Sequence, residues 1–218
     1  MLLIRDEFYK LAKEIKKGNV KVVTELIPFI DWVNKKYSVK VLNVSIEYEK
    51  IKNKIIPRIS IILERRSDFN KFVDDRLTID INKQNECLEA FLKLYPKKIK
   101  NVEEAFVTFD NFENTAIYEA ISAVKKDELE EIKKSVDKDC LWLIDNTMGF
   151  FVVFTNTEKE REEINTSDAC KIIKEKLFNL VKLYDEFNYI TPDILKIEFD
   201  SKENFEKNYK GNWFYYYR

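Results

Sequence analysis

Glycine is almost absent from this chain of 218 residues, where it occurs at positions 18, 149 and 211 only. The fingerprint loop of dinucleotide-binding folds and the phosphate-binding loop of P-loop folds each need several glycines within a few residues. Three glycines so far apart cannot form either loop. The sequence therefore excludes both of these fold families and the cofactors that they bind.

Histidine does not occur at all. Imidazole is the commonest general base near neutral pH and a frequent metal ligand. A serine or cysteine nucleophile activated by histidine is therefore impossible, as is a zinc site that contains histidine. We expect a protein that needs no cofactor, and we favour a non-catalytic role.

The composition is that of a soluble globular protein, with 45% hydrophobic residues and with charged residues scattered among them. No apolar run approaches the ~20 residues of a membrane span, and the first residues do not form a secretion signal. We therefore expect a cytoplasmic protein that does not bind membranes. The abundance of Lys, Asn, Ile, Phe and Tyr is typical of AT-rich coding sequences and suggests a bacterial source.

The three cysteines, Cys87, Cys140 and Cys170, are too widely spaced for a metal clip and too few for a disulfide framework. We interpret them as small core residues. The alternative is a catalytic thiolate, for which Cys170 is the best candidate because it falls in the first turn of a predicted helix.

Hydrophobic periodicity predicts an α+β fold, with antiparallel sheets covered by helices. The expected helices cover residues 3–17, 20–36, 87–95, 112–135 and 166–187. The expected strands cover residues 39–48, 55–63, 76–81, 105–109, 141–144, 150–154, 194–199 and 213–217.

Residues 20–109 and 114–199 have the same predicted order of helix, hairpin, helix and strand. This order suggests two tandem ferredoxin-like units, 1–110 and 111–218, or one continuous domain. Residues 1–109 contain 22 Lys and Arg against 16 Asp and Glu, a balance of +6, and the remaining residues have a balance of −7. Such an asymmetry steers charged partners.

Five successive aromatic residues, 213–217, make the C-terminus the most distinctive local sequence. On a strand, Trp213, Tyr215 and Tyr217 would face the same side. Together with Lys210 they could stack on nucleic-acid bases or form the centre of a protein interface. The structural alternative is that these rings anchor a terminal strand in the core.

Four aspartates, Asp80, Asp110, Asp145 and Asp200, lie near the ends of predicted strands. Carboxylates that converge at one edge of a sheet could bind Mg²⁺ or Mn²⁺. The local alternatives are helix caps for Asp110 and Asp200 and a turn for Asp145.

These features support three hypotheses. The first is a protein-binding domain, such as an immunity or inhibitor protein that neutralises its partner through charge complementarity and aromatic anchors. The second is a divalent-metal-dependent enzyme acting on phosphodiesters or nucleotides. The third is a single-strand nucleic-acid binder that uses the aromatic tail.

Overall fold

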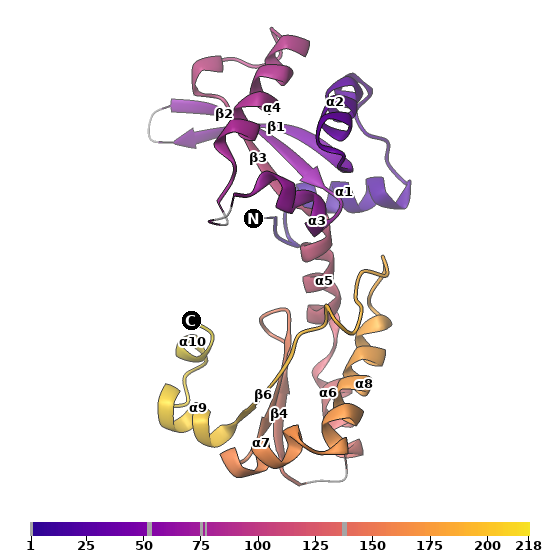
Figure 1. The fold of residues 1–218 in the computed structure, drawn as a ribbon, viewed down its shortest axis with the longest axis vertical. Coiled ribbons are helices and arrows are strands. Elements are labelled where there is room, and N and C mark those ends of the chain that lie inside the picture. Colours follow the sequence, from indigo (N-terminus) through magenta and orange to yellow (C-terminus); the bar gives the residue numbers. More distant parts are fainter. Residues whose placement is uncertain (1, 52–53, 75, 77, 137–138) are drawn as a thin grey trace. The chain divides into compact units, whose positions relative to one another are not determined.

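The computed structural model describes residues 2–51, 54–74, 76, 78–136 and 139–218. Within these ranges the protein is an α+β fold with two three-stranded sheets (Figure 1). The chain divides into two compact units, Met1–Thr115 and Ala116–Arg218, which we call unit 1 and unit 2.

Unit 1 contains a sheet in the order β1-β2-β3. Strands β1 and β2 form an antiparallel hairpin, whereas β3 runs parallel to β2, with Leu63 opposite Asn111 at the end of the pairing. The elements are α1 (Glu7–Lys17), α2 (Ile27–Tyr37), β1 (Val41–Ile51), β2 (Lys54–Leu63), α3 (Arg66–Phe69), α4 (Ile81–Leu94) and β3 (Phe106–Asn111), with 3-10 turns at Thr24–Leu26, Asn70–Phe72 and Val102–Glu104.

Alternating residues of the three strands place their apolar side chains on one face of the unit 1 sheet. Val44, Ile61 and Val107 belong to this set, and they pack against Phe29 of α2 and Phe91 of α4. Two long helices are therefore needed to cover a single sheet face, as is usual for small α+β units.

Unit 2 repeats this plan with the sheet order β4-β5-β6. Strands β4 and β5 are antiparallel, and β6 is parallel to β5, with Thr155 opposite Ser201. Helix α5 (Phe112–Ala123) crosses the boundary between the units, and the other elements are α6 (Lys126–Ser135), β4 (Leu141–Asp145), β5 (Phe151–Thr155), α7 (Glu158–Asn165), α8 (Asp168–Lys182), β6 (Ile197–Ser201), α9 (Lys202–Tyr209) and α10 (Trp213–Tyr216).

Both faces of the unit 2 sheet are covered. Ile144 and Val153 belong to the core formed with α6 and α8, whereas Val152 and Phe154 pack against Phe205 of α9 and the aromatic residues of the C-terminus. The second face is rich in aromatic side chains, and it determines where the tail of the chain lies.

The two units also share details that the order of elements alone does not require. The register of each hairpin shifts at the same place, between Val41 and Asn43 in β1 and between Leu141 and Leu143 in β4. The third strand and the following helix start read Phe-Asp-Asn-Phe-Glu-Asn in residues 109–114 and Phe-Asp-Ser-Lys-Glu-Asn in residues 199–204. These correspondences indicate an internal structural repeat.

The repeated glutamate makes equivalent hydrogen bonds in both units. The backbone N–H of Glu113 donates to Glu64 O and that of Glu203 donates to Asn156 O, each at 3.2 Å. The Glu113 carboxylate accepts from Arg66 N at 2.7 Å, and the Glu203 carboxylate accepts from Glu158 N at 3.1 Å. In each unit, the glutamate thus ties the helix after the third strand to the helix that follows the hairpin.

Several predicted details were wrong. Each sheet is mixed rather than antiparallel, and the ferredoxin-like arrangement is not confirmed, because each unit has a hairpin and one parallel strand. Of the strand predicted at 76–81, residue 77 lies outside the described residues, and the described ones form an isolated bridge between Val73 and Ile79 instead of a strand. The helix predicted at 112–135 is two helices, α5 and α6.

Glu64 provides a test of charge burial in unit 1. Its residue is only 5% exposed, and its carboxylate contacts Lys16 Nζ at 2.5 Å and Lys40 Nζ at 2.6 Å. Burial acts to raise the pKa of Glu64, but the two ammonium groups outweigh it and hold the pKa below its ordinary value.

We expect Glu64→Gln to lower the free energy of unfolding at pH 7 by about 1–2 kcal/mol, because it leaves two ammonium groups without their carboxylate. A lowered pKa stabilises the fold above the unfolded value of about 4.3, so the difference from the wild type should shrink as the pH falls below it. Urea unfolding at a series of pH values measures this difference. A difference that is constant down to pH 3 would contradict the assignment.

Candidate functional site

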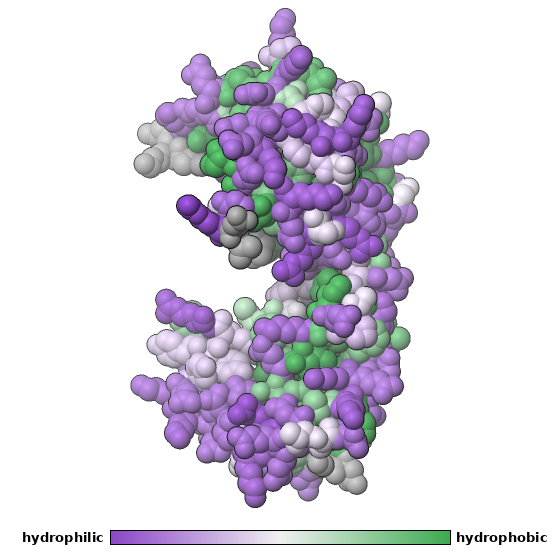
Figure 2. Space-filling model, in the orientation of Figure 1, coloured by the Kyte–Doolittle hydropathy of each residue, from purple (hydrophilic) through white to green (hydrophobic). Residues whose placement is uncertain are grey.

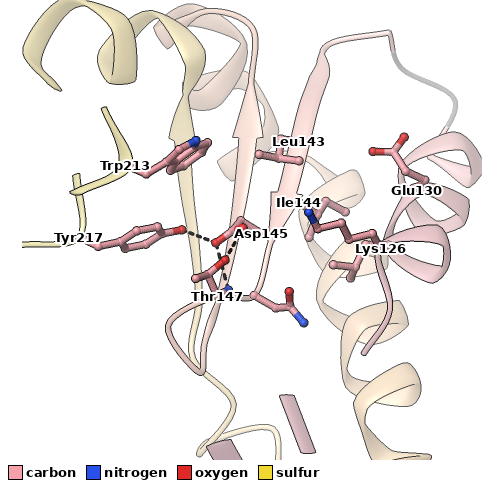
Figure 3. Close-up of a pocket in the computed structure, with 10 residues that line it drawn as sticks. Lys126, Glu130, Leu143, Ile144, Asp145, Thr147, Trp213 and Tyr217 are labelled. Carbon is pink, nitrogen blue, oxygen red and sulfur yellow. Dashed lines mark hydrogen bonds between the residues drawn. The ribbon is translucent and has the colours of Figure 1, made fainter. Parts of the chain in front are cut away.

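Unit 2 contains a pocket of about 530 Å³ beside strand β4 (Figure 3). Trp213 and Tyr217 lie on one side of the strand, and Lys126 and Glu130 of α6 lie on the other. The remaining lining residues are Leu129, Leu143, Ile144, Asp145, Asn146 and Thr147. Three segments that are distant in the sequence therefore meet at this pocket.

The C-terminal wall of the pocket is helical, and the predicted terminal strand at 213–217 was wrong. Asn212 caps the short helix α10 by accepting a hydrogen bond from Phe214 N. The helical spacing brings Trp213 and Tyr217 together, with ring centroids 5.9 Å apart and nearly parallel planes. The strand would have separated them along one face.

Two hydrogen bonds fix this wall to the sheet. Tyr217 Oη donates to Asp145 at the end of β4 at 2.5 Å, and Tyr216 Oη donates to Asp200 in β6 at 2.6 Å. Burial, followed by the bond to a carboxylate, raises the pKa of both phenols well above the ordinary value. Both tyrosines are therefore hydrogen-bond donors at neutral pH.

The hairpin turn between β4 and β5 is equally well fixed. Asp145 also accepts from Thr147 N at 3.1 Å and from Thr147 Oγ1 at 2.9 Å, so its role as a turn residue is observed. Asn146 Nδ2 donates to Ile121 O and to Val124 O near the end of α5. The pocket thus has a rigid rim, which suits preformed binding.

Of the predicted binding residues, the pocket brings together Trp213 and Tyr217. Tyr215 lies on α10 but is turned to the surface and is 55% exposed, next to Phe214, which is 66% exposed. Lys210 ends α9 in a left-handed conformation and does not line the pocket. Figure 2 shows a surface of intermediate hydropathy over α10, beside the mostly hydrophilic surface of α9.

No pattern in the sequence indicated the α6 wall or the apolar floor. Lys126, Leu129 and Glu130 form an ordinary helical stretch, and Leu143 and Ile144 form an ordinary strand. The proximity of Asp145 to the tail became evident only from its bond to Tyr217.

The four aspartates proposed as metal ligands each accept hydrogen bonds that give them a structural role. Asp80 caps α4 by accepting from Asn82 N and Lys83 N, and Asp110 accepts from Leu2 N. The caps predicted for Asp110 and Asp200 belong to their neighbours Asn111 and Ser201. Among the residues that the structure describes, no group of three or more carboxylates or thiols is placed to hold a metal ion.

The cysteines lie in or beside the cores. Cys87 is fully buried in unit 1, and burial raises the pKa of its thiol to about 12. Cys170 lies in the first turn of α8, as predicted, but is buried in the unit 2 core. Cys140 packs against the same core. These positions favour a packing role over a reactive thiolate.

Comparisons with protein-family models, curated proteins and solved structures found no match to this chain. No helix in the described part of the chain is long and apolar enough to cross a membrane. The chemistry of the pocket is a half-exposed aromatic wall, an apolar floor and a few charged groups.

Proposed function

We propose that the protein acts by binding another protein through unit 2, as immunity and inhibitor proteins do when they neutralise a partner. The observation that carries this proposal is the C-terminal aromatic cluster on α10. Its inner rings are fixed by hydrogen bonds to Asp145 and Asp200, while Phe214 and Tyr215 are exposed. Rigid, exposed aromatic side chains are the typical energetic centre of protein interfaces.

Charge supports the same proposal. Residues 116–218, which form unit 2, contain 16 Lys and Arg against 21 Asp and Glu, a balance of −5, so a basic surface around the contact would be attracted to unit 2 and would associate rapidly. The three cysteines are free thiols, which fits the cytoplasmic location that we include in the proposal.

We expect the double substitution Phe214→Ala/Tyr215→Ala to weaken partner binding at least about tenfold. Both rings are largely exposed in the free protein and would be buried against the partner in the complex. The partner is first identified as a stoichiometric band captured from cell extract, then purified and titrated by calorimetry. Because Phe214 and Tyr215 are exposed, circular dichroism should show an unchanged fold.

Leu183→Ala is the matched control, because Leu183 is 80% exposed but lies just after α8 and away from the pocket lining. It should leave the affinity unchanged. Capture of no stoichiometric partner, or equal affinity of the double variant and the wild type, would contradict the proposal.

A further inference from the structure

Strand β4 lies at the edge of its sheet. In the described residues it pairs with β5 alone, so its other edge is not used by the sheet. Leu143 packs toward α9 and α10, whereas Ile144 packs toward α6 and α8. Both residues nevertheless line the pocket, together with α6 on one side and α10 on the other. The pocket is therefore a groove that opens at the free edge of β4 (Figure 3).

The part of the β4 edge that is free for pairing begins after Trp142. Lys133 Nζ donates to the carbonyl oxygen of Trp142 at 2.8 Å, so a side chain of the protein already occupies that group. A lysine placed in this way prevents a further strand from pairing with β4 at Trp142. The part of β4 that remains, Leu143–Asp145, lies along the groove.

The charged residues of the groove differ in whether they have a partner within the protein. Asp145 accepts hydrogen bonds from Tyr217 and Thr147, and Glu130 lies 3.5 Å from Lys133 Nζ. Lys126 is exposed, and no carboxylate among the described residues lies within ion-pair distance of its Nζ. Among the charged residues that line the groove, Lys126 is thus the one without an ion pair or hydrogen bond to the described residues, and its complement is a carboxylate.

We infer that the groove binds an extended segment of the partner protein, which adds to β4 as a fourth strand and places an Asp or Glu side chain next to Lys126. Strand addition uses main-chain hydrogen bonds for affinity and alternate side chains for specificity. One set of alternate side chains would contact Leu143 and the ring of Trp213. This inference rests on the proposed function and specifies how the partner is recognised.

The test uses a display library of random dodecapeptides selected on the immobilised protein. We expect the selected peptides to share one acidic position with apolar residues at alternate positions. Lys126→Glu should weaken them about tenfold by placing like charges together. Peptides with Lys at the acidic position should bind this variant better than the wild type. Lys126 is the first residue of α6, where Glu is favourable, so the variant should fold.

Lys134→Glu is the matched control, because it makes the same charge change on the same helix outside the pocket lining. N-methylation of the selected peptide, one residue at a time, tests strand pairing directly. Methylation should abolish binding at alternate positions only, since alternate N–H groups face β4. Binding that is indifferent to every methylation or to Lys126→Glu, or a library that yields no binder, would overturn the inference.

The two proposals fail differently. The natural partner could lose affinity with Phe214→Ala/Tyr215→Ala but bind Lys126→Glu as it binds the wild type. In that case, protein binding through the C-terminal aromatic cluster is supported and strand addition is wrong. If the natural partner binds all of these variants equally, the proposed function fails as well.

Discussion

Phe154→Ala is expected to lower the free energy of unfolding of unit 2 by about 3–5 kcal/mol, because it removes a fully buried ring and leaves a cavity. Phe154 lies at the centre of the aromatic face of the sheet. Its ring centroid is 5.6 Å from those of Trp142 and Trp213 and 5.3 Å from that of Tyr216. Urea unfolding followed by tryptophan fluorescence measures the loss, in a Trp32→Phe background that leaves only the two tryptophans of unit 2.

Ile62→Ala is the matched control in unit 1. Ile62 lies opposite Asp110 in the sheet register, as Phe154 lies opposite Asp200, and it is 1% exposed. We expect a loss of about 2–5 kcal/mol that Trp32 reports when the other two tryptophans are replaced by Phe. A loss of less than about 1 kcal/mol for Phe154→Ala would show that the aromatic face does not hold the tail.

The same substitution connects stability to the site. Phe154 contacts both Trp213, which lines the groove, and Tyr216, which is hydrogen-bonded to Asp200. Without the Phe154 ring, α10 would lose its packing contact with the sheet, whereas the edge of β4 would be unchanged. The groove therefore depends on a residue that does not line it.

The sequence predicted most elements but misjudged where some of them end. The helix expected at 166–187 ends at Lys182, although Tyr184 and Phe187 continue its apolar spacing. The reason is Asp185, whose buried carboxylate accepts from Tyr189 N and Ile190 N and so turns the chain into a loop. Periodicity alone cannot detect a side chain that competes for backbone donors.

The tail shows a second limit. A run of aromatic residues has a high strand propensity, which led to the prediction of a terminal strand. In the structure, the Asn212 cap and the packing of Trp213 and Tyr216 on Phe154 favour a helical turn. Tertiary contacts outweigh a local propensity of about 1 kcal/mol when several rings pack together.

The groove could not have been predicted from any single stretch. Its walls come from residues 126–130, 143–147 and 213–217, which are brought together by the pairing of β4 with β5 and by two tyrosine–aspartate bonds. By contrast, the tandem order of elements was visible in the sequence, because periodicity is a local property. The parallel direction of the third strand was missed, although its long helical connection permits it.

Glu113→Ala is expected to lower the free energy of unfolding by about 2–3 kcal/mol, since it removes a buried carboxylate that accepts from Arg66 N and contacts Arg65. The equivalent change Glu203→Ala should cost about 1 kcal/mol or less, because Glu203 is exposed and water can replace its bond to Glu158 N. Urea unfolding of the two variants gives both values, and Glu113→Gln, which keeps an acceptor oxygen, should restore part of the loss. If Glu113→Ala leaves the free energy of unfolding unchanged, the hydrogen bonds at equivalent positions in the two units do not stabilise the helix starts. The units would then resemble each other in structure without having this stabilising interaction in common.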